Sequence, residues 1–568
     1  MSLWKKITLA LVATLLLLVL LIVGLVSTNA GISFITGQAV KYVPGLSIGK
    51  VEGNIAGFKL HQFRYQMPGI DVSADSLGVE LTLKCLVQGT LCVDSVNSKG
   101  INVQVNTALL PPSEPVEPTA PLTELLAPLP ITLSELSLKE TQVTIDEMAI
   151  TLAEFPTAAQ WQGRQVTLSP TLIDKLHISL PPQPEANKPE PEPVAEPATP
   201  EEALGEKLEA IFSQPFLQEL PEVIIPVDVE IQRIEAKDLQ ISGDSPLIIN
   251  EILLEGQIND SEVNLTTFRV NAPEGTASMV GKAELKQNWP VELTLNSALN
   301  IPELRGEKVK VEFKGDVLGE LNLYANVSGP VSANLHAYVN LAEKGLPLLA
   351  TLESQRLQWP VSGEAQYRAD GVKLRLNGKA QDYTLSLRSD LSGSDVIPVK
   401  VRLDGKGNEK QFSLTRLRLL TMEGTADLSG KVDWSKAISW NTVLLIDGIN
   451  TAKTLPDWPA TLAGKIVTRG SLHGGNWRID VPELNLSGNV MQQKLLATGK
   501  LSGDAAGFWQ VPKLNVSLGD NRLVAQGNLG QKWNLDASLA VPNLGTALPG
   551  AKGTINVLFK LRGSQQAP

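Results

Sequence analysis

The sequence predicts a mainly β protein, an elongated β-solenoid of repeated antiparallel strands with one N-terminal transmembrane helix and one short amphipathic helix. Three observations point to this class: short runs alternate aliphatic and polar residues, one motif recurs, and a single long apolar run lies near the N-terminus. No long helical stretches separate the alternating runs, so a βαβ architecture is not expected. The 568-residue chain is 43% hydrophobic, 19% charged and only 5% aromatic, so aliphatic surface can be buried along most of its length.

The composition also excludes several functions. The formal net charge of −11 argues against a nucleic-acid partner, because phosphate contacts require clustered Lys and Arg. Two cysteines and four histidines scattered through the sequence offer no metal-ligand spacing, and the motifs of serine hydrolases, zinc proteases and P-loop enzymes are absent. We therefore expect no catalytic residue, metal or cofactor, and an enzyme is the less favoured interpretation.

The apolar run from Ile7 to Val26 predicts a transmembrane signal-anchor helix. Twenty uncharged residues form a helix roughly 30 Å long, enough to cross a hydrocarbon core. Two lysines precede the run and no basic residue follows it before Lys41, which places residues 1–6 in the cytoplasm. The rest would lie in the periplasm, attached to a bacterial inner membrane by a single pass. The alternative is a signal peptide cleaved near Thr28-Asn29-Ala30, although the run is longer than a usual signal sequence.

Cys85 and Cys92 are predicted to form a disulfide. If Gln88-Gly89 forms a two-residue hairpin turn, the flanking strands place the two cysteines directly opposite each other, within the Cα separation that a disulfide requires. An oxidising periplasm agrees with this pairing. Two buried thiols that never meet are the alternative.

Shifts in composition divide the exported chain into β regions and linkers. Residues 31–107 form an N-terminal β region with the Cys85–Cys92 hairpin, and residues 131–180 form a second β region. Residues 108–130 and 181–200 are rich in Pro, the second also in Glu, and we expect both to be extended linkers.

An amphipathic helix is predicted over residues 201–219. Thr199 can cap it, and Leu204, Leu208, Ile211 and Phe212 form a stripe that we expect to pack on the core. Residues 223–568 form the repeated β-solenoid, which we expect to continue beyond the end of the chain.

Alternating runs in this last region predict strands with one apolar and one polar face. Turn residues separate them, as in the predicted turn Asp404-Gly405-Lys406-Gly407-Asn408. The side chains assigned to the inward face are Val291, Leu293, Leu295, Val372, Leu374, Leu376, Val399, Val401, Leu403, Ile555, Val557 and Phe559.

A short motif recurs thirty residues apart, at Val481-Pro482-Glu483-Leu484, Val511-Pro512-Lys513-Leu514 and Val541-Pro542-Asn543-Leu544, with a looser copy at Ile301-Pro302-Glu303-Leu304. A fixed period in this range indicates units stacked along one axis, although chance similarity among strands is the alternative.

Further motifs stand in order along the chain: Met1-Ser2-Leu3-Trp4-Lys5-Lys6-Ile7, Val43-Pro44-Gly45-Leu46-Ser47-Ile48-Gly49-Lys50-Val51, the cysteine pair, Gly306-Glu307-Lys308-Val309-Lys310, Asp447-Gly448-Ile449-Asn450-Thr451-Ala452-Lys453, Asp457-Trp458-Pro459 and Arg469-Gly470-Ser471-Leu472. In this combination the sequence resembles the amino-terminal part of the TamB family, the inner-membrane subunit of the translocation and assembly module within the AsmA-like superfamily.

The resemblance implies a long periplasmic β-solenoid with a taco-like hydrophobic groove, an outer-membrane barrel partner of the TamA type, and roles in outer-membrane assembly and phospholipid transport. Members of the family are about twice as long as this chain, and the part that engages the barrel would lie beyond its last residue.

Three functions follow as hypotheses. The first is a conduit in which the inward-facing residues listed above line a groove for phospholipids between the inner and outer membranes. The second is a scaffold or chaperone that presents sheet edges during insertion or secretion of outer-membrane proteins and autotransporters. The third and least favoured is a periplasmic hydrolase, supported only by the abundance of carboxylates.

Overall fold

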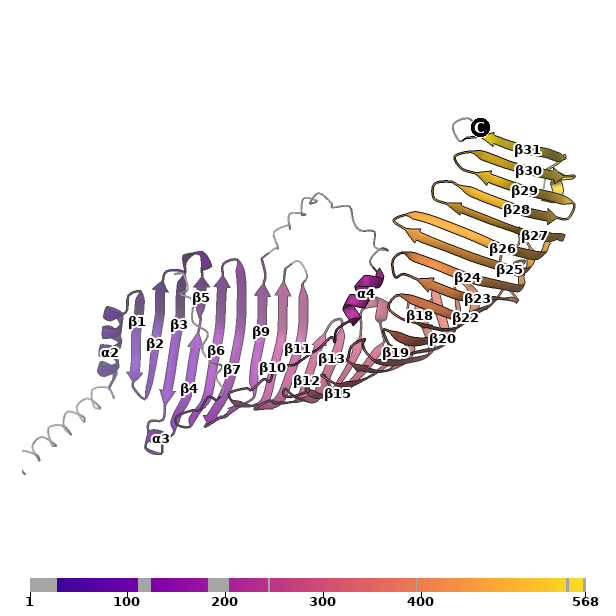
Figure 1. Ribbon diagram of the computed structural model, residues 1–568. Helices are drawn as coiled ribbons and strands as arrows, with labels where there is room; N and C mark the ends of the chain where they lie inside the picture. Colours follow the sequence, from indigo (N-terminus) through magenta and orange to yellow (C-terminus); the bar gives the residue numbers. More distant parts are fainter. Residues whose placement is uncertain are drawn as a thin grey trace, which may run out of the picture. The chain divides into compact units, whose positions relative to one another are not determined.

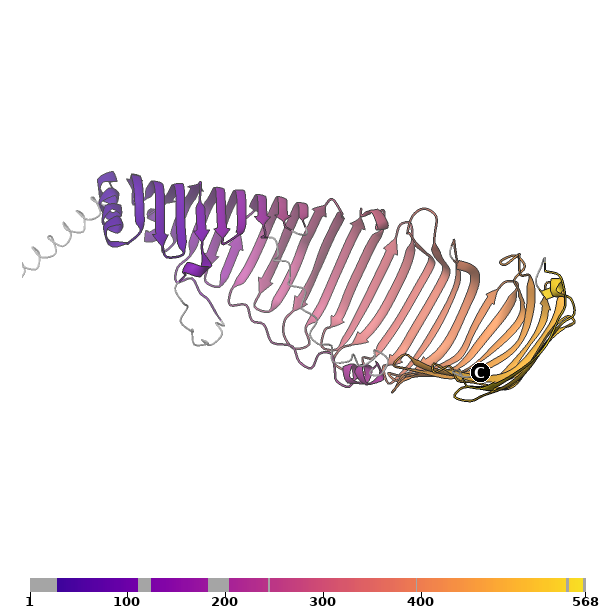
Figure 2. The ribbon, with the colours of Figure 1, turned by 90° about the horizontal axis from the view of Figure 1, so that it is seen from above.

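The computed structural model describes residues 28–110, 124–181, 204–243, 246–394, 396–547 and 551–564. The chain divides into two compact units. Unit 1 comprises Met1–Glu190 and Pro221–Ala298, and unit 2 comprises Pro191–Leu220 and Leu299–Pro568. In both units the strands lie side by side in one layer (Figures 1 and 2).

Unit 1 contains two short helices and a sheet of mostly long strands. Its elements are α2 (Asn29–Tyr42), β1 (Leu46–Asn54), β2 (Gly57–Met67), β3 (Ile70–Leu81), α3 (Lys84–Val87), β4 (Leu91–Lys99), β5 (Asn102–Val105), a 3₁₀ turn (Thr107–Leu109), β6 (Ile131–Ile145), β7 (Met148–Gln162), β8 (Gln165–Leu168), β9 (Thr171–Ser179), β10 (Asp228–Ser242), β11 (Leu247–Asn259), β12 (Glu262–Ala272), β13 (Gly275–Glu284) and β14 (Pro290–Leu299).

Most neighbours in this sheet are antiparallel, but two positions are parallel. Strands β4 and β5 form one row that pairs in parallel with β6, and β8 and β9 form a second row that pairs in parallel with β10. A parallel pair requires a crossover connection of about a dozen residues or more, whereas an antiparallel pair needs only a tight turn. The two Pro-rich segments predicted as linkers fall in these two connections, between β5 and β6 and between β9 and β10.

Residues with a left-handed backbone conformation lie at matching positions on neighbouring strands of the unit 1 sheet. A row of facing residues crosses it as His61, Ser76, Lys99 and Lys139 and continues as Glu154, Asp174 and Lys237. Immediately after this row, the backbone has φ between 52° and 66° at Gln62, Gly100, Glu140, Lys175 and Asp238. In β6, Ser137 is buried before Glu140, and Leu136, Leu138, Thr141 and Val143 have intermediate exposure. The pairing of β6 with β7 keeps one register on both sides of Glu140, so the left-handed residues interrupt the regular strand conformation without changing the strand partners.

Unit 2 is a sheet in which each strand pairs antiparallel with the next along the chain. Its elements are α4 (Leu204–Phe212), a 3₁₀ turn (Pro302–Leu304), β15 (Lys308–Asp316), β16 (Glu320–Ser328), β17 (Ser332–Asn340), β18 (Leu348–Trp359), β19 (Tyr367–Lys379), β20 (Asp382–Gly393), β21 (Val396–Gly407), β22 (Gln411–Thr421), β23 (Gly424–Asp433), β24 (Ile438–Asn450), β25 (Ala460–His473), β26 (Asn476–Val490), β27 (Gln493–Asp504), β28 (Trp509–Leu518), β29 (Asn521–Leu529), β30 (Trp533–Val541), α5 (Leu544–Ala547) and β31 (Ile555–Gly563).

The thirty-residue repeat corresponds to two antiparallel strands. Val481 lies in β26 and Val511 in β28, and in both strands the pairing register shifts between this valine and the leucine three residues later. The proline after the valine has no N–H to donate, which suits a bulge. The other copies differ: Val541 ends β30, and Ile301 precedes a 3₁₀ turn rather than starting a strand.

The fold class is mainly β as predicted, but several local predictions were wrong. Asp404–Gly407 are part of β21, and the turn follows at Asn408–Lys410. Residues 31–42 belong to helix α2 rather than to a β region, because Thr28 caps the helix by accepting a hydrogen bond from the Gly31 N–H. Helix α4 ends at Phe212, seven residues before the predicted end.

The predicted anchor, Ile7–Val26, lies outside the described residues. Among the residues that are described, no helix has both the length and the apolar character needed to cross a bilayer.

Candidate functional site

The apolar face of the unit 2 sheet is the candidate functional site. One row of directly facing residues crosses this sheet, and every strand from β15 to β31 contributes an apolar residue or a glycine to it. The members of this central row are Val311, Ala325, Leu335, Leu352, Leu374, Leu387, Leu403, Leu417, Leu428, Leu444, Ile466, Leu484, Gly499, Leu514, Ala525, Ala537 and Phe559. At about 4.8 Å per strand, the row extends for roughly 75 Å along the sheet.

A second row runs beside the central row from β21 to β31. Its members are Val401, Leu419, Ala426, Ile446, Gly464, Leu486, Ala497, Val516, Leu523, Leu539 and Val557. The two rows together give this half of the face a width of at least two side chains without any charged residue.

Aromatic rings cover glycines along one margin of the same face. Trp440 faces Gly470, and Trp509 faces Gly503. A Cβ atom at Gly470 would lie 2.1 Å from the Trp440 ring, and one at Gly503 would lie 2.6 Å from the Trp509 ring. Each ring therefore lies directly over a glycine, and the absence of a side chain there is what allows the ring to lie on the sheet.

The apolar face is only partly buried. Ala497 and Ala525 are buried, but most members of the two rows retain intermediate exposure and Phe559 is 44% exposed. In the described part of the chain no large side chain has a relative exposure below 2%. A closed sandwich core would bury many such side chains completely, so the face is not covered by a second layer from within its unit.

The opposite face of the unit 2 sheet is charged. Lys373 and Arg375 alternate with the leucines of β19 and are exposed. Asp427 receives hydrogen bonds from Arg418, at 2.8 and 2.9 Å, and from Arg416 at 3.0 Å. The hydrogen bond from Arg418 has the larger effect and that from Arg416 the smaller, and together they hold the pKa of the Asp427 carboxyl far below its ordinary value. The sheet therefore has one hydrated face and one aliphatic face.

Helix α4 joins turns along one edge of the unit 2 sheet. In its first turn, the Gly205 N–H donates to the Trp434 carbonyl at 3.2 Å. Glu209 pairs with Lys410 at 2.7 Å, and the Phe212 carbonyl accepts from the Gly345 N–H at 3.0 Å. Ile211 is 52% exposed, so the predicted core-facing stripe is wrong for part of the helix. The helix fixes alternate turns rather than filling a core.

Unit 1 has an apolar row of the same kind on its own sheet. It consists of Leu46, Tyr65, Val72, Val103, Val143, Ile150, Ile178, Ile241 and Leu247. Four neighbouring turn segments are tied together at one edge of this sheet. Arg164 pairs with Asp228 at 3.1 Å and with Asp260 at 3.3 Å, and Lys286 also pairs with Asp260. The hydrogen bond from Lys286 lowers the pKa of the Asp260 carboxyl.

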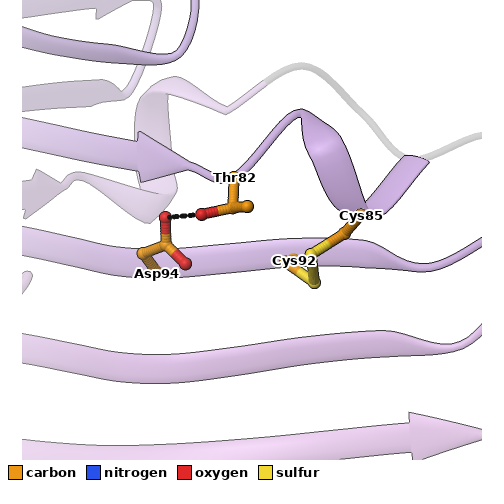
Figure 3. The surroundings of a disulfide bond; sticks show 4 residues. All are labelled: Thr82, Cys85, Cys92 and Asp94. Carbon is orange, nitrogen blue, oxygen red and sulfur yellow. Dashed lines mark hydrogen bonds between the residues drawn. A yellow bond between two sulfur atoms is a disulfide. The ribbon is translucent and has the colours of Figure 1, made fainter. Parts of the chain in front are cut away.

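Cys85 and Cys92 are joined by a disulfide with a Cα–Cα separation of 5.9 Å (Figure 3). The predicted two-residue hairpin is wrong, because Lys84–Val87 form the helical turn α3 and Val87 is 92% exposed. Leu91 pairs with Ile131 of β6 instead of with Leu86. Beside the bridge, the Thr82 hydroxyl donates to the Asp94 carboxylate at 2.6 Å (Figure 3).

The structure brings some of the predicted inward-facing residues together. Leu374, Leu403 and Phe559 belong to the central row, and Val401 and Val557 belong to the second row. Four more lie on the same face of their strands as these row members. They are Leu376, Val372, Val399 and Ile555, and they face Leu385, Ser354, Leu391 and Val541, respectively. The remaining three, Val291, Leu293 and Leu295, alternate along β14 in unit 1, where the Leu293 side chain lies against Gly281.

Sequence reasoning missed the glycine–aromatic pairs and helix α2. A glycine that faces an aromatic residue on the neighbouring strand gives no local signal, since the contact depends on the pairing register. Helix α2 did leave a signal, the Thr28 cap. No group of three or more His, Cys, Asp or Glu side chains among the described residues is arranged to hold a metal ion.

These observations define a class of protein whose long β sheets present one continuous aliphatic face and one charged face. A family model described as TamB, N-terminal domain, matches residues 17–568, and the chain belongs to this family.

Two relatives show how much of such proteins the chain covers. The translocation and assembly module subunit TamB of Haemophilus influenzae is 25% identical over 575 residues, which cover 98% of this chain and 44% of the relative. An uncharacterized protein of Buchnera aphidicola subsp. Acyrthosiphon pisum is 18% identical over 548 residues, which cover 96% of this chain and 54% of that protein. The chain thus spans about half of the length of these relatives. No solved structure matches the chain.

Proposed function

We propose that this chain is part of a periplasmic bridge, anchored in the inner membrane, that carries phospholipids towards the outer membrane along its apolar face. In this role it supports outer-membrane assembly together with an outer-membrane barrel partner of the TamA type. The observation that carries the proposal is the central row, in which each strand from β15 to β31 presents an apolar residue or glycine on a partly exposed face.

The energetic argument concerns the acyl chains. A phospholipid that crosses water exposes its tails at about 0.8 kcal/mol per methylene, or on the order of 10 kcal/mol for one chain. An uninterrupted aliphatic face replaces this single large barrier with many nearly equal positions. Neighbouring residues in the row lie on adjacent strands, only about 4.8 Å apart, so a tail can remain in contact with several of them at once.

Photo-crosslinking in cells tests the proposal. A photoreactive amino acid at Leu403, on the apolar face, should crosslink to phospholipid, whereas the same residue at Arg402, which is exposed on the charged face of the same strand, should not. Equal lipid crosslinking from both positions, or none from Leu403 in protein of normal abundance, would contradict lipid passage on this face.

A second candidate function is a scaffold for outer-membrane proteins. In strand β31, Leu558 is 76% exposed and Phe559 is 44% exposed. Exposed apolar side chains of this kind can contact the apolar side chains of an unfolded client protein. In the same crosslinking experiment, protein adducts from Leu558 in place of lipid adducts from Leu403 would favour this function.

A further inference from the structure

Helix α2 is buried only near its first turn. Gly31 and Ile32 are buried where the helix packs along β1, the first strand of the unit 1 sheet (Figure 1). The side chains of Phe34 and Tyr42 are 60% and 74% exposed, and Ile35, Val40 and Val43 are each more than a third exposed. This is a large amount of apolar and aromatic surface for a helix of fourteen residues and its C-cap, and none of the described residues of unit 1 covers it.

The charge of this part of the chain is also unusual. The first acidic residue of the whole sequence is Glu52, although the chain as a whole has a net charge of −11. The preceding 51 residues contain four lysines and no Asp or Glu. One of these lysines, Lys41, lies over the Tyr42 ring, with its ammonium nitrogen 5.7 Å from the ring centroid. Lysine and tyrosine side by side at the end of an apolar surface are typical of a membrane interface, where the ring sits at headgroup level.

The connection to the preceding sequence limits where α2 can lie. Thr28, the cap of the helix, follows the predicted anchor after a single residue. A fourteen-residue helix is about 21 Å long, and only two residues separate it from the predicted anchor, so α2 can lie along the membrane surface over its whole length. Its exposed side chains contact lipid headgroups in this orientation.

We infer that α2 lies on the outer surface of the membrane, with Phe34, Ile35 and Tyr42 inserted among the headgroups of an anionic bilayer and Lys41 paired with lipid phosphate. Apolar insertion and attraction of lysine to anionic lipid act together in such interfacial helices. The apolar row of unit 1 begins at Leu46, four residues after Tyr42. The bound helix would hold the start of this row at the bilayer surface, where lipid tails could leave the membrane. The inference rests on the inner-membrane attachment proposed above but does not require lipid passage.

Spin-label depth measurements on the full chain test this inference. Single cysteines at Phe34, Tyr42 and Lys139 would each carry a nitroxide, with the native cysteines kept in their disulfide, in vesicles of phosphatidylethanolamine and phosphatidylglycerol. Labels at 34 and 42 should be reached more readily by oxygen than by a water-soluble nickel complex. The label at Lys139, a residue with a 54% exposed side chain on β6, should show the reverse.

Each outcome is decisive. Aqueous accessibility at both 34 and 42 would overturn the inference, and so would spin–spin broadening, which would mean that a second copy of the chain covers this face. Lys41→Glu should move the label at 34 towards water in anionic vesicles but not in purely zwitterionic ones; no such difference would overturn the electrostatic part. Lipid crosslinking from Leu403 is a separate measurement, so failure of the proposed function would not be confused with failure here.

Discussion

Replacing Leu374 by Asp distinguishes an open apolar face from a closed core. Leu374 belongs to the central row, faces Leu352 on one neighbouring strand and Leu387 on the other, and keeps intermediate exposure. Complete burial of a leucine stabilises a protein by about 1.5–3 kcal/mol, so a half-buried one contributes roughly 1–1.5 kcal/mol. A carboxylate at this position would keep part of its water, and we expect a total loss of about 2 kcal/mol, leaving the fold intact.

If a second layer covered the face, the same change would bury an unpaired charge and destabilise the fold by about 4 kcal/mol or more. Urea unfolding of the protein measures this difference. The second measurement is the phospholipid balance between the two membranes in cells in which the variant has normal abundance and protease resistance, where Leu374→Asp should interrupt lipid passage.

Lys373→Asp is the matched control for this variant. Lys373 is exposed on the charged face and has Glu353 opposite on one strand and Arg388 on the other, so a reversal of its charge should change stability by less than about 1 kcal/mol. If Leu374→Asp and Lys373→Asp had the same small effects on stability and on lipid balance, the apolar face would not carry lipid at this strand. A loss above about 4 kcal/mol for Leu374→Asp would instead show that the face is closed.

Three further predictions concern stability. Mass mapping without reductant should find Cys85 joined to Cys92. Replacing both by Ser should lower the free energy of unfolding by only about 2 kcal/mol, because a short closed loop constrains the unfolded chain little. Two free thiols in protein purified under native conditions would contradict the pairing. Asp427→Asn should cost about 1–2 kcal/mol at neutral pH. Because the folded pKa of Asp427 is depressed, the stabilisation by its carboxylate is fully present above the unfolded pKa near 4 and is lost as pH falls below it. The free energies of unfolding of the two proteins should therefore converge in acid. A constant difference between them down to about pH 2 would refute the ion pair as the cause. Gly470→Ala should destabilise unit 2 because the new Cβ would overlap the Trp440 ring. Trp440→Leu should relieve part of this effect in the double variant. Purely additive losses of unfolding free energy in a double-mutant cycle would contradict the contact.

The sequence predicted the strands well where two-residue alternation is regular and less well where it breaks. In β19, Val372, Leu374 and Leu376 share one face as alternation requires. In β6 the regular alternation is interrupted near Glu140, whose backbone is left-handed. Such a residue costs conformational energy that only its neighbours across the sheet can compensate, so a single strand read in isolation cannot reveal it. The hairpin predicted between Cys85 and Cys92 was wrong for a similar reason. The length of this loop fits a hairpin, but Leu91 pairs with β6 and not with the residues before the loop.

The bulges explain how one apolar row can persist across so many strands. Val481 and Leu484 are three residues apart and would point to opposite faces of an ideal strand. The register shift between them places Val481 opposite Leu501 and Leu484 opposite Gly499, two residues that share a face of β27. The same shift occurs between Val511 and Leu514, thirty residues later. The recurring Val-Pro-x-Leu motif is therefore the local sequence of a bulge, and its repetition keeps β26 and β28 in phase with the row. Loss of one bulge would turn every residue beyond it to the other face, so the bulges are as necessary to a continuous aliphatic path as the leucines that line it.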